Sequence, residues 1–189
     1  FIYATYADNE LNWDGSKISD QSNFLARLLM TGELDPSFGS GGAMNIDDGL
    51  TEIEQIESLP NGNMIIVGLT KSSQFRMIML ENDGALNYKF GLDGQFTLPK
   101  DFYVKDILEQ DNGKILVSGS YQGQFSIARY HANGTPDFRF AKGNGIRKYA
   151  FSRTDETVAN EMKSMPKGKL LVRGYSIKKN SGQIKDDFL

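Results

Sequence analysis

One phrase occurs three times in this chain, and its spacing constrains the fold more than any other feature. Each copy places a turn glycine before a short apolar run that ends on a second glycine, and the three copies are Pro60 to Gly68, Asp111 to Gly119 and Pro166 to Gly174. The turn glycines Gly62, Gly113 and Gly168 are 51 and 55 residues apart. A fixed period of this length indicates a repeat architecture.

Three further features recur along the chain with a similar period. A second turn glycine recurs, an aromatic residue follows it six positions later, and a polar residue lies three positions before the aromatic. These marks are Gly32, Gly84 and Gly134; Phe38, Phe90 and Phe140; and Asp35, Asn87 and Asp137. The glycines and the aromatics share spacings of 52 and 50 residues. Marks that stay in step over three copies define a structural repeat.

Each full copy contains four short strand candidates. In the third copy they are Ile115 to Ser118, Phe125 to Tyr130, Gly145 to Ala150 and Glu156 to Met162, and the second copy is divided in the same way. Asn-Gly pairs between apolar runs predict type I′ hairpin turns, in which both central residues have positive φ. Asn112-Gly113 is therefore interpreted as joining the last strand of one copy to the first strand of the next. The predicted repeats are 1–59, 60–110, 111–165 and a partial 166–189.

Helix is the competing prediction for two segments, Thr51 to Leu59 and Glu156 to Met165. The corresponding segment of the second copy, Phe102 to Leu108, is aromatic and β-branched, which favours a strand. Equivalent segments of a repeat share a structure, so all three are predicted to be strands.

Four strands in about 50 residues are typical of a propeller blade, whose faces are buried only by its neighbours. The fold class predicted is an all-β, β-propeller-like array of four-stranded antiparallel blades that is incomplete at both ends. Phe38, Phe90 and Phe140 are predicted to lie in the core between blades. We expect a fragment of a longer chain, or an element completed by another subunit.

The repeated phrases resemble the delta-60 repeat. The resemblance rests on Asp111 to Gly119, the run Phe125 to Tyr130, the segments Gly32 to Gly39 and Ala132 to Asp137, and the Phe-x-Phe of Phe138 and Phe140. It covers almost the whole chain, and it implies a β-propeller-like repeat of bacterial surface, secreted or phage-associated proteins. The second copy departs from the pattern, because Met79 stands where Arg27 and Arg129 stand.

Composition excludes several classes of function. The net charge of −3 gives no basic surface for nucleic acid, and no apolar run is long enough for membrane insertion. The absence of cysteine excludes disulfides and thiolate chemistry. No phosphate-binding loop or serine-protease-like motif accompanies the single histidine, His131. No cofactor is expected except calcium, for which Asp8, Asp14 and Asp20 provide oxygen ligands.

The recurring polar and charged residues each have two interpretations. Asp35, Asn87 and Asp137 are metal or sugar ligands, or they form Asx turns by accepting a nearby backbone N–H. Arg27 and Arg129 present positive charge to an anionic ligand, or they pair with carboxylates across blades. Trp13, with Asp14 beside it, contacts a sugar or a protein from a long loop, or it packs over the edge of a blade.

No catalytic set of residues emerges, so we expect a non-enzymatic module of an extracellular or cell-surface protein, bacterial or of a phage virion. Its partner would be a protein or a glycan, as in adhesion. Two alternatives stay open: an architectural subunit of a filament or phage tail that contacts neighbouring subunits, and a propeller glycosidase or lyase. Carboxylates converging on the propeller axis would favour the enzyme.

Overall fold

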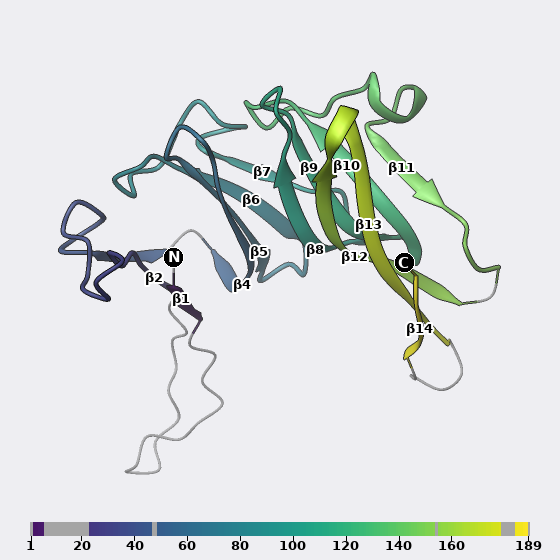
Figure 1. Cartoon of the computed structure of the whole chain (residues 1–189), viewed down its shortest axis with the longest axis horizontal. Helices are drawn as coiled ribbons and strands as arrows, with labels where there is room; N and C mark the ends of the chain where they lie inside the picture. The colour runs from purple at the N-terminus through teal and green to yellow at the C-terminus, as the bar shows by residue number, and fades with distance from the viewer. Residues whose placement is uncertain (1, 6–22, 47–48, 154, 179–183, 189) are drawn as a thin grey trace, which may run out of the picture.

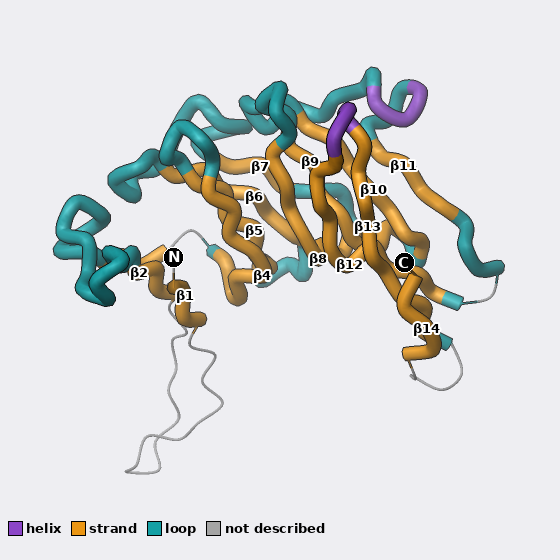
Figure 2. Tube along the Cα trace, viewed as in Figure 1, coloured by secondary structure: helices purple, strands orange, loops and turns teal. Residues whose placement is uncertain are grey.

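The computed structural model describes residues 2–5, 23–46, 49–153, 155–178 and 184–188. Within these residues the chain is almost entirely β-structure, and the two helical elements are single 3-10 turns, Phe140–Lys142 and Pro166–Gly168 (Figure 2). The predicted all-β fold class is thus confirmed. No helix of the described residues has the length and apolarity needed to cross a membrane.

The strands form four antiparallel sheets that follow one another along the chain. The first sheet contains β1 (Ile2–Thr5), β2 (Asn23–Ala26) and β3 (Ala43–Ile46); the second contains β4 (Leu50–Ser58), β5 (Met64–Thr70), β6 (Phe75–Leu80) and β7 (Gln95–Thr97); the third contains β8 (Phe102–Glu109), β9 (Ile115–Tyr121), β10 (Gln124–Tyr130) and β11 (Ile146–Tyr149); and the fourth contains β12 (Glu156–Met165), β13 (Lys169–Ile177) and β14 (Ile184–Phe188). Figure 1 shows these sheets as a row, with β1 and β14 in its two end sheets.

The segments for which helix was the competing prediction are strands, as predicted. Their place in the sheets differs from the predicted one. β4, β8 and β12 each pair with the strand that follows them, so each begins a sheet instead of completing the previous one. The reason is the short turn between them, which can connect only antiparallel neighbours. The sheets are therefore offset by one strand from the repeats drawn along the sequence.

The turn itself also differs from the type I′ turn predicted for Asn112-Gly113. Only the glycine has positive φ, with 74° at Gly113. The Gly113 N–H donates to Gln110, and the Gln110 N–H donates to Lys114. These bonds define a three-residue loop, a type I turn followed by a left-handed glycine. The Asn112 side chain accepts the Lys114 N–H at 3.1 Å, which holds this loop without positive φ at Asn112.

The glycine that ends each repeated phrase faces a bulge in the strand beside it. The ladders of β4, β8 and β12 each skip one residue opposite these glycines, at Glu54, Lys105 and Asn160. At Gly68, Gly119 and Gly174, a Cβ atom would collide with a backbone carbonyl oxygen of the bulged strand. Glycine is needed here for the close approach of two backbones, because the collision is with backbone and has no side chain that could give way.

The core lies between consecutive sheets. Ile65, Val67 and Met77 of the second sheet pack against Val104 and Val117 of the third. A second cluster joins the first and second sheets, and a smaller one joins the third and fourth through Leu116, Ile127 and Met162. Each sheet therefore buries apolar faces against its neighbours, which is the stacking expected of propeller blades.

Candidate functional site

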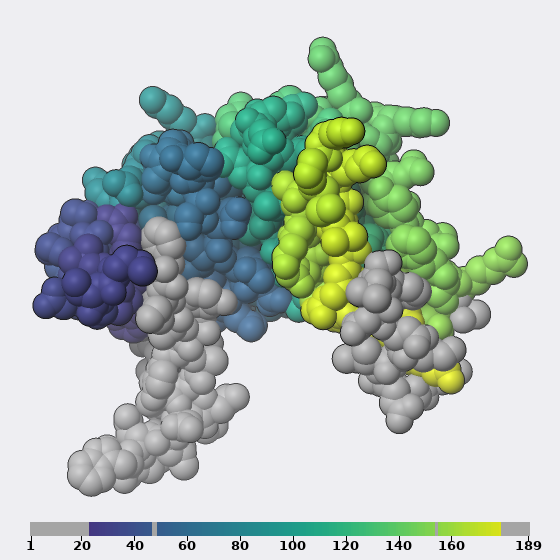
Figure 3. Space-filling view, viewed as in Figure 1, coloured from purple at the N-terminus to yellow at the C-terminus, as the bar shows by residue number. Residues whose placement is uncertain are grey.

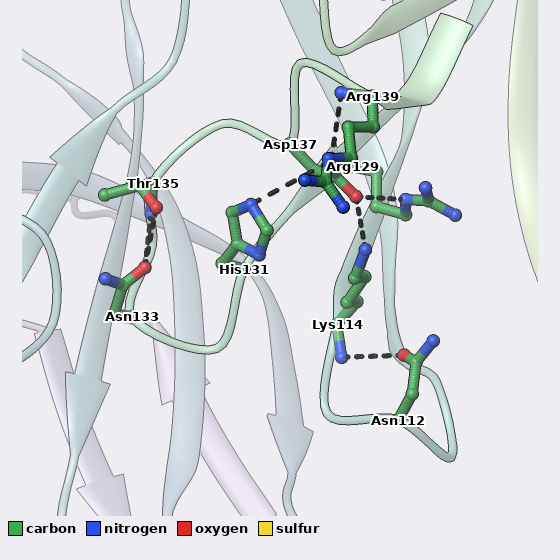
Figure 4. Close-up of polar contacts among 8 residues, drawn as sticks. All are labelled: Asn112, Lys114, Arg129, His131, Asn133, Thr135, Asp137 and Arg139. Atoms are coloured by element: carbon green, nitrogen blue, oxygen red, sulfur yellow. Dashed lines mark hydrogen bonds and ion pairs between the residues drawn. The ribbon is translucent and has the colours of Figure 1, made fainter.

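A buried carboxylate in the third sheet gathers the largest set of charged side chains among the described residues. Asp137 lies in the loop between β10 and β11, Arg129 lies near the end of β10, and Lys114 follows the turn before β9 (Figure 4). The Asp137 N–H donates to the Arg129 carbonyl, which brings the loop back over the strand that carries the arginine.

Asp137 has almost every acceptor position filled. Its Oδ2 accepts from Lys114 Nζ at 2.6 Å and from Arg129 Nε at 2.9 Å. Its Oδ1 accepts the Arg139 N–H at 3.1 Å and lies 3.9 Å from His131 Nε2. The side chain of Asp137 is only 1% exposed. The hydrogen bond from Lys114 is the main reason why the pKa of Asp137 is lowered to about 2.

The first repeat carries a related cluster. Arg27 Nε donates to Asp35 Oδ2 at 2.7 Å, and Asp35 Oδ1 accepts from the Ser37 hydroxyl at 2.7 Å. The Ser37 hydrogen bonds lower the pKa of Asp35. Arg27 also donates to the backbone carbonyl and side-chain oxygen of Asn82, which belongs to the next sheet. Arg27 therefore ties two sheets together.

The arginines do not pair with carboxylates across sheets, as one interpretation held. Arg27 and Arg129 each pair with the carboxylate eight residues later, within their own sheet. The loop after the strand folds back, so the nearest carboxylate is local. Each guanidinium also lies over the repeat aromatic, 5.0 Å from the Phe38 ring centre and 4.6 Å from that of Phe140. Both arginines thus make contacts inside their own sheet, and Arg27 also donates to Asn82 of the next sheet.

All three recurring polar residues form the same Asx turn. The side-chain oxygens of Asp35, Asn87 and Asp137 each accept the backbone N–H two residues later, at 3.0 to 3.1 Å. Asn87 makes this turn without a charge. The structure thus supplies the folding role, and the role of these residues as ligands stays a prediction.

The recurring aromatics interlock with the turn glycines of the following sheet. Phe38 and Phe90 are each 1% exposed, and their rings lie about 3 Å from the position that a Cβ atom would take at Gly84 and Gly134. The backbone N–H after each phenylalanine donates to the carbonyl before that glycine. Phe140 is only partly buried, because no turn of this kind from a following sheet covers it within the described residues.

Carboxylates also gather along β4 and β8, the first strands of their sheets. Burial raises the pKa of Glu57, Asp106 and Glu109, and the charges of Asp106 and Glu109 act on Glu57 in the same direction. Asp106 accepts the Met162 N–H of the fourth sheet at 2.6 Å and its neighbour's N–H, from Ile107, at 2.9 Å. Asp106 therefore connects the third and fourth sheets.

The bulges carry further bonds between sheets. Lys105 Nζ pairs with Glu54 at 2.6 Å, and the Gln55 amide donates to the Lys105 carbonyl at 3.2 Å. Sequence reasoning missed these residues and Lys114. The signal was available, because Glu54, Lys105 and Asn160 keep the spacings of 51 and 55 residues of the turn glycines.

The predicted turn glycines have a conformational role only, and the residues predicted in the first loop lie outside the described part of the chain. Gly62, Gly113 and Gly168 all have positive φ in the turns that begin β5, β9 and β13, with Lys167 also at positive φ beside Gly168. Trp13 and Asp14 lie outside the described residues, as do the other aspartates proposed for calcium. Within the described residues, no group of three histidine or carboxylate side chains could hold a metal ion.

Comparison with known proteins gives one match to a protein family. The family is described as a domain of unknown function (DUF5122), β-propeller, and its model matches residues 14–38 and 110–140. No curated protein matches the chain. The matched segments contain Arg27, Asp35 and Phe38 and their counterparts Arg129 and Asp137, so the β-propeller repeat is the part of this chain that is shared.

Among solved structures, the chain is similar to a protein of unknown function from Bacteroides caccae. The two share 14% sequence identity with a TM-score of 0.45, over 77% of this chain and 48% of that one. The chain thus spans about half the length of that structure.

Proposed function

We propose that this chain is a non-enzymatic β-propeller module that binds protein through the open face of its last sheet, as an architectural unit of a larger assembly. The partner that fits this face is a further sheet of the same kind, stacked in the manner of the sheets inside the chain. The proposal rests on one observation: a position that is buried in two sheets is open in the third.

That position lies three residues after the turn glycine. Ile65 in the second sheet is 0% exposed, Leu116 in the third is 2% exposed, and Leu171 in the fourth is 53% exposed. Ile65 and Leu116 are covered by the following sheet. Leu171 and the neighbouring residues Glu161, Lys163, Val172 and Arg173 line a largely apolar hollow of about 300 Å³. Figure 3 shows this last sheet at the surface, in yellow.

The opposite end of the row offers the complementary surface. Phe24 of β2 is 45% exposed, whereas its neighbours Asn23 and Leu25 are buried. Alternating side chains face opposite sides of a strand, so Phe24 lies on the face that points away from the second sheet. Contact between two different faces makes a head-to-tail interface, which builds rings or filaments.

The test is a charge placed on the open face. Leu171→Glu should weaken self-association at least tenfold in sedimentation velocity, because a buried unpaired carboxylate opposes binding. Leu92→Glu is the matched control, since Leu92 is 80% exposed in the loop between β6 and β7. A wild-type chain that sediments like Leu171→Glu at every concentration would overturn the proposal.

A second candidate, a glycosidase or lyase, is favoured by the carboxylates of β4 and β8. Glu57 and Glu109 have raised pKa values, as a general acid requires, although Asp106 is engaged by backbone amides. Hydrolysis of a polysaccharide by the wild type that disappears in both Glu57→Gln and Glu109→Gln would support this candidate. No turnover across a panel of acidic and neutral polysaccharides would reject it.

An extracellular location, on a bacterial surface or a phage virion, is part of the same proposal and rests on the resemblance to the delta-60 repeat. Glycan binding or adhesion through Trp13 and Asp14 is a further part. A glycan array with the wild type and Trp13→Ala tests it directly, and equal binding by both would remove these residues from the site.

A further inference from the structure

The second repeat contains a hollow where the third repeat has a buried ion pair. It measures about 170 Å³ and lies between the second and third sheets. Its lining combines apolar side chains, three asparagines and one carboxylate: Leu59, Met79 and Ile115, with Ala132 and Gly113; Asn61, Asn63 and Asn87; and Glu109.

Repeat equivalence identifies what the hollow lacks. The spacing of the turn glycines places Asn63 where the third repeat has Lys114, and Asn87 takes the place of Asp137. In the third repeat, Lys114 Nζ reaches the carboxylate at 2.6 Å. The shorter, uncharged Asn63 leaves the space of a lysine ammonium group unfilled.

The hollow contains a carboxylate oxygen that lacks a donor, beside asparagine amides that carry both donors and acceptors. Glu109 Oε2 is buried and has no hydrogen-bond partner within the described part of the chain. The other carboxylate oxygen lies 3.8 Å from the position of a Cβ at Gly113, at the wall of the hollow. The Asn87 amide nitrogen has one contact, 3.7 Å to Met79 Sδ, which is a weak acceptor. A buried carboxylate oxygen without a donor is costly.

We propose that this hollow binds the ammonium group of a primary alkylamine. An ammonium group carries three N–H donors and one positive charge, and its main acceptor would be the free Oε2 of Glu109. The oxygens of Asn61 and Asn87 already accept one backbone N–H each, so each would contribute only its second lone pair. The alkyl chain of the amine would lie against Leu59, Met79 and Ile115. This site rests on the hollow alone and does not depend on the open face of the fourth sheet.

An NMR titration with n-propylammonium chloride at constant ionic strength tests the site. We expect saturable shifts of the Asn63 and Asn87 side-chain amides. Sodium chloride and tetramethylammonium chloride, which offer no N–H donors, should give none. Equal shifts with either salt would overturn the proposal, and so would the absence of saturable shifts with propylammonium.

Three variants locate the site. Glu109→Gln keeps the size of the side chain and removes its charge, so affinity should fall at least tenfold. Asn63→Lys should abolish binding by supplying an internal ammonium group. Glu33→Gln removes the same charge from a turn of the first repeat and should leave the dissociation constant within twofold. Unchanged affinity in Glu109→Gln, or equal losses in Glu109→Gln and Glu33→Gln, would overturn the assignment.

A free amine and a lysine of a partner protein present the same group. Nα-acetyl-lysine methylamide and its Nε-acetylated form distinguish these sources. Tighter binding of the lysine derivative than of propylammonium, lost on Nε-acetylation, indicates a lysine of a partner. Binding of propylammonium alone indicates a free amine. Leu171→Glu should bind propylammonium like the wild type, so failure of this site and failure of the proposed assembly can be told apart.

Discussion

The second and third repeats have the same backbone loop with different chemistry. In the third, Lys114 and Arg129 hold a buried aspartate at 2.6 and 2.9 Å. In the second, the equivalent residues are Asn63, Met79 and Asn87, which leave a hollow. Both loops keep the Asx turn. The fold therefore requires a side-chain oxygen at this position, whereas the charge is a property of individual repeats.

At the recurring aromatic position the second repeat is the better packed of the two, because Phe90 is buried and Phe140 is only partly buried. Phe90→Ala should cost about 3–5 kcal/mol of unfolding free energy, since it opens a cavity between two sheets. Phe140→Ala should cost only about 1–2 kcal/mol, because the ring is partly exposed. Urea unfolding of both variants measures the difference. Equal losses would mean that Phe140 is covered in solution, which would itself support a following sheet.

The buried aspartate gives the next largest contrast. Asp137→Ala should cost about 3 kcal/mol, at the low end for a broken buried ion pair, because Lys114 and Arg129 are partly exposed and can be rehydrated. Asn87→Ala should cost about 1 kcal/mol, the value of one hydrogen bond.

The same urea series separates charge from turn in the third repeat. Asp137→Asn removes the charge and keeps the Asx turn, because an asparagine forms the same turn at Asn87. Its loss of unfolding free energy should therefore lie between the losses of Asp137→Ala and Asn87→Ala. If Asp137→Asn equalled Asp137→Ala, the turn would contribute nothing measurable.

Acid should remove the stability that the charge of Asp137 adds to the third repeat. The pKa of Asp137 is lowered to about 2 from the ordinary value of 3.8, with Lys114, Arg129 and His131 as the facing charges. A lowered pKa adds stability that is complete above pH 4 and is lost as the pH falls from 4 to 2. Asp137→Asn should therefore lose less stability than the wild type over this interval. Parallel pH profiles in thermal unfolding would contradict this prediction.

The sequence predicted the repeat and its strands well because both follow from local pattern. Turn glycines, apolar runs and the aromatics repeat at fixed spacing, so the strand identity of Phe102 to Leu108 could be extended to its equivalents. The grouping of strands into sheets was wrong by one strand, because a repeat can be cut at any point of its period. The pairing of strands on either side of Asn112-Gly113 decides where the sheets begin.

The site was less accessible to sequence reasoning because it depends on how the loops fold back. Asp137 was identified by its recurrence, but its partner Lys114 lies 23 residues earlier, and the second repeat has Asn63 in its place. The bulges at Glu54 and Lys105 arise from pairing between strands, which apolar patterning does not encode. Exceptions to a repeat, such as Asn63 and Met79, carry the information about specific sites.

The arginines provide the smallest and most discriminating comparison. Replacement by Met copies the residue of the second repeat while keeping an apolar contact with the aromatic ring. Arg129→Met should cost about 1 kcal/mol, because Lys114 still pairs with Asp137. Arg27→Met should cost about 2 kcal/mol, because it also breaks the bonds to Ser37 and to Asn82 of the next sheet.

Asn82→Ala isolates the bond between sheets, since the alanine keeps the backbone carbonyl and loses only the side-chain oxygen that Arg27 reaches at 3.0 Å. In a double-mutant cycle, Arg27→Met and Asn82→Ala should couple, whereas Arg129→Met and Asn82→Ala should add. Additive losses for the first pair would mean that the Asn82 side chain contributes nothing measurable, and that Arg27 acts on the next sheet only through the Asn82 carbonyl.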